Sequence, residues 1–126
     1  YCVGKAGIEE MMKNCADEFG GRGVRFNSIR PGFIATELME GVPRDSATYA
    51  SYIENTPMRD VGRPDDVGAL ARFLIGPESR WITGTAINVD GGHHLRRGPD
   101  FGPFLEPMLG ANVMQGELPG RKKVGR

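Results

Sequence analysis

Apolar residues recur with a helical period over residues 1–19, and polar residues fill the positions between them. The apolar positions that recur every three or four residues are Ile8, Met11, Met12, Cys15 and Phe19. Side chains at these spacings share one face of a helix, so the pattern predicts an amphipathic α-helix. We expect Gly20 and Gly21 to end this helix in a left-handed C-cap.

A shorter apolar pattern follows over residues 24–29, where apolar and polar residues are interleaved. The pattern predicts a β-strand, which the turn-forming pair Pro31 and Gly32 would end. A helix, a glycine stop and a strand in this order are typical of the second half of a βαβ unit. The order therefore predicts an α/β fold.

A second helix and a second strand are predicted further along the chain. Residues 64–75 repeat apolar positions with a helical period, with Pro64 suited to the first turn and Gly76 to the end. Residues 86–89 carry no charge on either face of a strand, which is typical of an interior strand in a parallel sheet.

Residues 37–60 follow the carboxyl end of the first predicted strand. We expect a helix from about Ser46, with that serine as the N-cap. Loops at this edge of an α/β sheet usually contact the ligand. Tyr49, Tyr52 and Met58 are therefore candidates to line a substrate pocket, and ordinary packing between loop and helix is an equally weighted alternative.

Residues 93–126 combine many glycines and prolines with apolar side chains, and we expect no helix there. The apolar residues of this segment include Phe101, Phe104, Leu105, Met108 and Leu109. They would form an apolar lid over the active site of the same or a neighbouring subunit. The alternative is a tail laid across the subunit surface or partly disordered.

Charge and cysteine content limit the partners of the chain. Sixteen basic and sixteen acidic residues give a formal net charge of zero, which argues against a nucleic-acid partner. The basic run at residues 121–126 is interpreted as a solvated tail. No stretch has the apolar length of a transmembrane helix, so no membrane partner is expected. Cys2 and Cys15 would lie about 20 Å apart along a helix, too far to form a disulfide, which fits a cytoplasmic protein.

The adjacent residues His93 and His94 do not predict a metal site. Side chains of neighbouring residues point in different directions, and no third ligand occurs at a suitable spacing. We interpret both histidines as exposed turn residues.

Four motifs occur in a familiar order. They are Tyr1 and Lys5 in a Tyr-x-x-x-Lys pattern, PGFIAT at 31–36, GRPDDVG at 62–68 and ITGTAINVDGG at 82–92. Over residues 1–92 this ordered set resembles the C-terminal half of a short-chain dehydrogenase/reductase. The resemblance implies the C-terminal half of a Rossmann-type, doubly wound parallel sheet in three α/β/α layers. Residues 1–97 would belong to the catalytic domain and residues 98–126 would form an extension.

The Tyr-x-x-x-Lys pair carries the chemistry that the resemblance implies. Residues four apart on a helix share one face. A free phenol has a pKa near 10 and is a poor proton donor or acceptor at neutral pH, but an ammonium within about 4 Å stabilises the phenolate and lowers that pKa. Tyr1 would exchange a proton with the substrate, and Lys5 would favour the phenolate and hold the nicotinamide ribose. A surface helix with a snorkelling lysine is the alternative without chemistry.

The resemblance also implies a nicotinamide cofactor, NAD or NADP, without indicating which. Pro31 and Gly32 would turn the backbone beneath it, Ile34 would bond the carboxamide through its main chain, and Thr36 would offer its hydroxyl to the carboxamide or the pyrophosphate. A plain turn at the end of a strand is the alternative. The expected reaction interconverts a secondary alcohol and a ketone, and the expected assembly is a homodimer or homotetramer.

Two other functions remain open at this point. The family's glycine-rich dinucleotide turn and active-site serine precede the tyrosine, so we expect that this sequence lacks the N-terminal half. One alternative is therefore an inactive fragment or an assembly piece. Within the family, a reductase of 3-oxoacyl thioesters shares all the motifs seen here.

Overall fold

The computed structural model describes residues 1–114. Its elements are the α-helices α1 (Cys2–Gly20), α2 (Ala47–Glu54), α3 (Pro64–Ile75), α4 (Gly102–Leu109) and α5 (Ala111–Met114), the strands β1 (Ser28–Pro31) and β2 (Ala86–Val89), and the 3-10 helices η1 (Glu37–Gly41), η2 (Pro77–Ser79) and η3 (His93–Leu95). The basic run predicted as a solvated tail lies outside the described residues. None of the described helices is long and apolar enough to cross a membrane.

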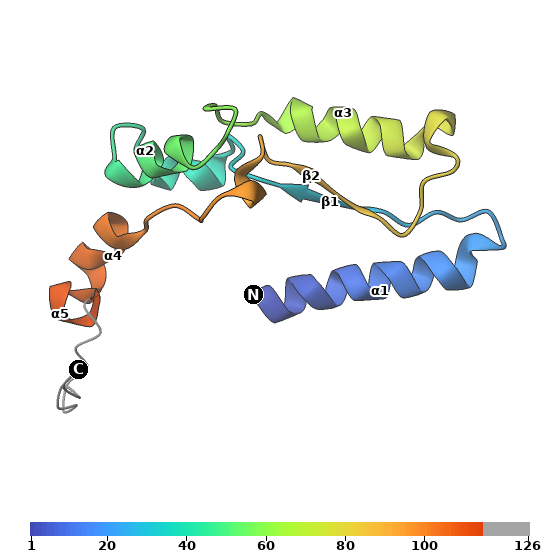
Figure 1. The fold of residues 1–126 in the computed structure, drawn as a ribbon, viewed down its shortest axis with the longest axis horizontal. Coiled ribbons are helices and arrows are strands. Elements are labelled where there is room, and N and C mark those ends of the chain that lie inside the picture. Colours follow the sequence, from blue (N-terminus) through green and yellow to red (C-terminus); the bar gives the residue numbers. More distant parts are fainter. Residues whose placement is uncertain (115–126) are drawn as a thin grey trace.

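The two strands form a parallel pair between two helical layers. Ser28 of β1 is paired with Ala86 of β2, and Pro31 is paired with Val89. Figure 1 shows α1 on one face of this pair and α3 on the other, which gives the predicted three α/β/α layers. The N-terminal end of α1 lies on the same side of the molecule as the carboxyl ends of both strands (Figure 1). Ligands of α/β proteins bind at that edge of the sheet.

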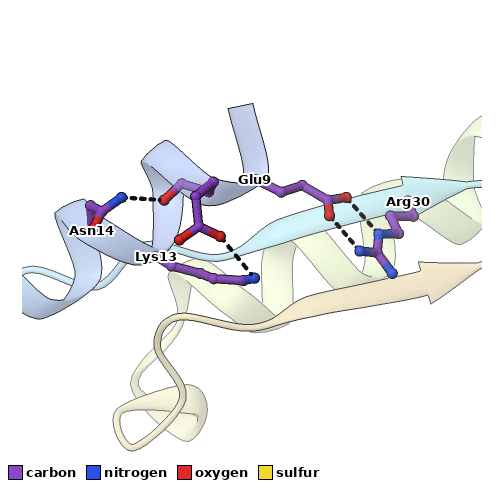
Figure 2. Close-up of polar contacts among 5 residues, drawn as sticks. Glu9, Lys13, Asn14 and Arg30 are labelled. Carbon is purple, nitrogen blue, oxygen red and sulfur yellow. Dashed lines mark hydrogen bonds and ion pairs between the residues drawn. The ribbon is translucent and has the colours of Figure 1, made fainter. Parts of the chain in front are cut away.

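Helix α1 is held to β1 by packing and by one ion pair. Met12 and Ala16 of α1 are buried. Glu9 of α1 binds the guanidinium of Arg30 on β1 through both carboxylate oxygens (Figure 2). The hydrogen bond from Arg30 lowers the pKa of the Glu9 carboxyl below its ordinary value. This bidentate geometry sets the orientation of the helix relative to the strand.

The end of α1 differs in detail from the prediction. Gly21 follows the helix with a right-handed φ of −64°, whereas the left-handed residue is Gly23, with φ of 76°. The helix unwinds through hydrogen bonds from Arg22 to the carbonyl of Phe19 and from Gly23 to that of Gly20. The chain therefore reverses two residues later than expected, at the position where glycine tolerates a positive φ.

Strand β1 begins at Ser28, later than the predicted start at Val24. Before Ser28, hydrogen bonds to and from side chains take the place of the regular backbone hydrogen bonds between strands. The side-chain amide nitrogen of Asn27 donates to the main-chain carbonyl of Ile82 at 2.9 Å. The hydroxyl of Thr83 accepts from the main-chain N–H of Phe26 at 3.1 Å. These contacts join segments far apart in the sequence, so apolar alternation alone does not reveal them.

Helix α3 begins and ends where the sequence predicts. Pro64 occupies its first turn and Gly76 follows its last residue. Arg25 donates to the carbonyl of Leu74 at 2.7 Å, and Ser79 donates to the same carbonyl at 2.9 Å. A guanidinium at this end complements the negative end of the helix dipole, so the segment after α1 stabilises α3.

Helix α2 has the predicted N-cap. The side-chain oxygen of Ser46 accepts a hydrogen bond from the N–H of Tyr49 at 3.1 Å. Such a cap satisfies one of the backbone donors that the first turn leaves unpaired. The helix therefore starts at Ala47, next to the carboxyl end of β1.

The prediction that the segment after residue 92 holds no helix is wrong. Helix α4 places Pro103 in its first turn and is followed by Gly110, with φ of 83°. Proline at the start and glycine at the end are compatible with a short helix, because neither removes an internal hydrogen bond there. Pro103 and Gly110 mark the limits of α4, whereas Pro107 lies inside it. The glycines and prolines of this segment therefore do not prevent a short helix.

Candidate active site

The segment after β1 begins with a close approach between two backbones. The N–H of Gly32 donates to the carbonyl of Val89 at 2.9 Å. A Cβ atom on Gly32 would lie 2.6 Å from both Cα and Cβ of Asp90. A side chain does not fit in this space, so glycine at the end of β1 allows the chain to pass directly over the end of β2.

The next residues form an isolated parallel bridge. The N–H of Gly62 donates to the carbonyl of Phe33 at 3.0 Å, and the N–H of Ala35 donates to the carbonyl of Gly62 at 2.8 Å. The N–H and C=O of Ile34 face away from this bridge. Neither group has a hydrogen-bond partner among residues 1–114. Ile34 thus offers one donor and one acceptor, which is the complement of a primary carboxamide.

A cleft opens beside this segment, with a volume of about 1150 Å³. Its lining residues are Phe33, Ala35, Thr36, Glu37, Met39, Glu40, Val42, Pro43, Arg44, Tyr49, Asp60, Val61, Arg63 and Pro64. They include apolar side chains and charges of both signs. This volume slightly exceeds the range of about 300–1,000 Å³ that is usual for small-molecule sites, so the cleft is large enough for such a ligand.

Tyr1 and Lys5 lie together at the N-terminal end of α1. The N–H of Lys5 donates to the carbonyl of Tyr1 at 3.0 Å, and its ammonium nitrogen lies 5.6 Å from the centre of the Tyr1 ring. Both side chains are exposed. Neither residue lines the cleft. The helix brings the predicted proton-transfer pair together on the side of the molecule where the strands end (Figure 1).

Of the three predicted substrate contacts, only Tyr49 lines the cleft. Tyr52 stacks on Phe33 with ring centres 4.2 Å apart, so it lies behind a residue of the cleft wall. Burial raises the pKa of the Tyr52 phenol, which keeps the hydroxyl protonated at neutral pH. Met58 is 75% exposed, and its N–H donates to the carbonyl of Gly91.

Sequence reasoning missed Phe33, Arg44 and Arg63, which all line the cleft. Phe33 had a usable signal, because an aromatic residue directly after a strand and a glycine lies at the ligand-binding edge. Arg63 had a weaker signal, since it precedes the proline that starts α3. Arg44 lies in an irregular loop, where the apolar pattern carries no information.

The turn after β2 is held by Asp90. Its carboxylate accepts hydrogen bonds from the N–H of Gly92 at 2.9 Å and of His94 at 3.0 Å, and lies 2.8 Å from Nδ1 of the His94 ring. Burial alone would raise the pKa of Asp90, but the bonds from His94 and Gly92 outweigh it and lower that pKa. His93 packs edge-on against Tyr52. Within residues 1–114, no three potential ligands gather as a metal site.

Residues 95–101 lie against α2, and residues 95–114 do not line the cleft. Two hydrogen bonds and one aromatic contact join residues 95–101 to that helix. None of the residues that line the cleft comes from this segment. In the described part of the chain it is therefore a surface element beside α2, and a lid over a neighbouring subunit stays a prediction.

A sequence profile described as "Enoyl-(Acyl carrier protein) reductase" matches residues 1–94. The chain is 33% identical over 93 residues to a galactitol 2-dehydrogenase (L-tagatose-forming) of Cereibacter sphaeroides, which covers 74% of this chain and 37% of the relative. It is 37% identical over 92 residues to the 3-oxoacyl-[acyl-carrier-protein] reductase FabG of Thermotoga maritima. This match covers 73% of this chain and 37% of the relative. The chain therefore spans little more than a third of these relatives.

Solved structures resemble the fold as well. A short-chain type dehydrogenase/reductase from Mycobacterium ulcerans matches with a TM-score of 0.87 and 41% identity, over 94% of this chain and 43% of that one. A 4-hydroxyisoleucine dehydrogenase mutant complexed with NADH and succinate matches with a TM-score of 0.73 and 33% identity. The match covers 78% of this chain and 40% of that one. A 2-deoxy-d-gluconate 3-dehydrogenase structure from Agrobacterium tumefaciens with bound NADP has a TM-score of 0.73 and 31% identity. The match covers 76% of this chain and 39% of that one.

These likenesses agree with the geometry at the ends of the strands. The profile extends over the tyrosine–lysine pair, both strands and the Asp90 turn. The Rossmann-type arrangement predicted from the motifs is thereby confirmed. The chain belongs to the short-chain dehydrogenase/reductase family.

Proposed function

We propose that the protein carrying this chain is an oxidoreductase that interconverts a secondary alcohol and a ketone with NAD or NADP. The observation that carries this proposal is that the end of α1 with Tyr1 and Lys5 lies on the side of the molecule where β1 and β2 end (Figure 1). Ile34 follows the end of β1 by three residues, and its main-chain groups have no partner among residues 1–114. When bound there, the nicotinamide supplies or accepts the hydride.

Tyr1 exchanges a proton with the oxygen of the substrate in this proposal. The Lys5 ammonium nitrogen lies 5.6 Å from the centre of the Tyr1 ring, so the two side chains act as a pair in this proposal. The phenol then gives its proton to a carbonyl oxygen as hydride arrives, or takes one from a hydroxyl as hydride leaves. Lys5 would also donate to the ribose of the cofactor.

The segment from Pro31 to Thr36 holds the cofactor. The N–H of Ile34 would donate to the carboxamide of the nicotinamide and its C=O would accept from it, which would orient that group. Gly32 brings the backbone close to Asp90. The Thr36 hydroxyl, which makes no cap hydrogen bond to the described helix η1, would bind the carboxamide or the pyrophosphate. The relatives solved with NADH and with NADP support either cofactor.

The cleft beside this segment takes the remainder of the substrate. Tyr49 and Phe33 form an aromatic wall, with ring centres 5.5 Å apart. Tyr52 packs behind this wall against Phe33, and the side chain of Met58 is exposed at the surface. We therefore assign direct substrate contact to Tyr49 and not to the other two predicted residues.

A 3-oxoacyl thioester is the second candidate substrate. The similarity to FabG of Thermotoga maritima favours it. Such a substrate carries the same ketone and undergoes the same hydride transfer. A panel of simple secondary alcohols, ketones and 3-oxoacyl thioesters, each assayed with NADH and NADPH or their oxidised forms, separates the two candidates.

The homodimer or homotetramer and the cytoplasmic location remain predictions. Ile8 and Met11 on α1 are 53% and 61% exposed, and Trp81 after α3 is 89% exposed. Apolar side chains of this size at the surface support contacts with further protein. Those contacts would come from other subunits or from other parts of the same protein.

Replacing Tyr1 by phenylalanine tests the proposed reaction in the full-length protein. The change removes only the hydroxyl, so the fold and the cleft are retained. We expect kcat to fall by at least about 100-fold, the usual contribution of a positioned acid or base. The measurement is the change in NAD(P)H absorbance with the substrate panel, and unchanged turnover would contradict the assignment.

Lysine variants on the same helix provide a matched comparison. Lys5→Met removes the ammonium beside Tyr1, and it should lower kcat and weaken cofactor binding. Lys13→Met removes an exposed ammonium that pairs only with Glu10 within the described residues, and it should change neither. Equal effects of the two substitutions would argue against a catalytic role for Lys5.

A further inference from the structure

The residues from the end of η3 to the start of α4 form an arm that lies against the second half of α2. We define this arm as residues 95–101. Arg96 donates to the main-chain carbonyl of Glu54 at 2.9 Å, and the N–H of Asp100 donates to the hydroxyl of Ser51 at 2.9 Å. Both acceptors belong to α2, so the arm is fixed to one side of that helix.

The aromatic end of the arm contacts α2 through Tyr52. The Phe101 ring meets the Tyr52 ring edge-on, with centres 5.8 Å apart and an interplanar angle of 90°. Tyr52 also stacks on Phe33, with ring centres 4.2 Å apart and an interplanar angle of 13°. Phe33 is buried and lines the cleft. A continuous row of rings therefore joins the arm to the cleft wall.

We propose that Phe101 is a positioning residue that sets how well a bulky substrate fits the cleft, by holding Tyr52 against Phe33. The inference rests on the proposed function, because the cleft is there assigned to the substrate. Phe101 does not touch the substrate. It restricts α2, and α2 also carries Tyr49, the residue that forms the cleft wall with Phe33.

A loosened α2 would affect the substrate more than the chemistry. Tyr1 and Lys5 belong to α1, and the main-chain groups of Ile34 are fixed by the bridge to Gly62. Neither depends on the arm. Removing the Phe101 ring should therefore raise KM for large substrates and leave kcat and the KM of the cofactor nearly unchanged.

The test compares Phe101→Ala with Phe104→Ala in the full-length protein. The two phenylalanines are matched in exposure, at 39% and 40%, and of these two only Phe101 makes an aromatic contact with Tyr52. With acetophenone as the bulky probe, Phe101→Ala should raise KM about three- to tenfold, the range expected for loss of one aromatic pair. With acetone the change should stay below about twofold, and Phe101→Tyr should restore KM.

Hydrogen exchange of the α2 amides provides a second readout that needs no turnover. Phe101→Ala should accelerate exchange over residues 47–54 by a similar factor, and Phe104→Ala should not. Unchanged exchange in Phe101→Ala would overturn the proposal. A uniform loss of kcat with both probes would do so too, since it would indicate a general structural effect, as would equal behaviour of the two alanine variants.

The two proposals fail in different ways. If the wild-type protein turns over neither ketones nor thioesters, the proposed function is wrong and the specificity role of Phe101 is wrong with it. The α2 exchange rates then still decide whether Phe101 holds that helix. If the wild type is active and Phe101→Ala leaves KM for acetophenone unchanged, only the further inference is wrong.

Discussion

The contact between Gly32 and Asp90 makes a strong prediction about stability. In Gly32→Ala the new methyl carbon would lie 2.6 Å from Cα and Cβ of Asp90 and 3.2 Å from its carbonyl oxygen. Carbon atoms pack favourably at about 3.5–4.0 Å, so the ends of β1 and β2 must separate by about 1 Å. Main-chain atoms form two of these contacts, and a rotamer change does not relieve them.

The expected cost follows from two contributions. Forcing a methyl group into a filled space costs about 1–3 kcal/mol. Displacing Asp90 also weakens the hydrogen bonds from Gly92 and His94 to its carboxylate, each contributing about 1 kcal/mol. We therefore expect Gly32→Ala to lower the free energy of unfolding by about 3 kcal/mol. That is a large share of the roughly 5–15 kcal/mol that a domain has.

Urea denaturation followed by circular dichroism measures this difference, with Gly68→Ala as the control. Gly68 lies within α3 and has no atom within 4 Å of an added Cβ. The same methyl group there should raise the free energy of unfolding by up to about 1 kcal/mol, because alanine favours a helix over glycine. The two variants should therefore shift the urea midpoint in opposite directions with similar m-values.

The reasoning is refuted if Gly32→Ala costs less than about 1 kcal/mol, the lower limit for overpacking. It is also refuted if Gly68→Ala destabilises the protein equally. A stable Gly32→Ala variant would mean that the strand ends separate easily. The close approach would then not be the reason that glycine occupies position 32.

Two further predictions concern Asp90 and Arg59. Because its folded-state pKa is lowered, Asp90 contributes stability that is present above the ordinary aspartate pKa of about 3.9 and is lost as pH falls through the folded value. Asp90→Asn should thus cost about 1–3 kcal/mol at pH 5 and less at pH 3, and a constant difference would contradict this. Arg59 is the only non-glycine with positive φ, 56°, among residues 1–114. Arg59→Gly should raise the melting temperature and Arg59→Val should lower it, and the opposite order in thermal denaturation would refute the argument.

Local signals predicted the limits of several elements correctly, for reasons that lie within a few residues. Ser46 caps α2 because its hydroxyl reaches an N–H three residues later. Pro64 starts α3 because its ring fixes a helical φ and the first turn needs no donor. Both effects depend only on the neighbouring chain, so the sequence pattern is enough to identify them.

Contacts between distant segments account for the errors. Strand β1 begins late because Asn27 bonds to Ile82, 55 residues further along the chain. Tyr49 and Tyr52 share a face of α2 by their spacing, but only the position of Phe33 decides which of them reaches the cleft. Helical spacing cannot distinguish these cases, because it describes one helix without its neighbours.

Glycines at the carboxyl ends of the strands serve the fold and the site together. Gly91 has φ of 58° and lies so close to Thr56 that a Cβ would be 2.9 Å from its methyl group. This contact seats the loop after α2 on the turn after β2, next to the segment that carries Ile34 and Thr36. Substitutions at Gly32 or Gly91 should therefore change stability and cofactor binding together, whereas substitutions on the exposed face of α3 should change stability alone.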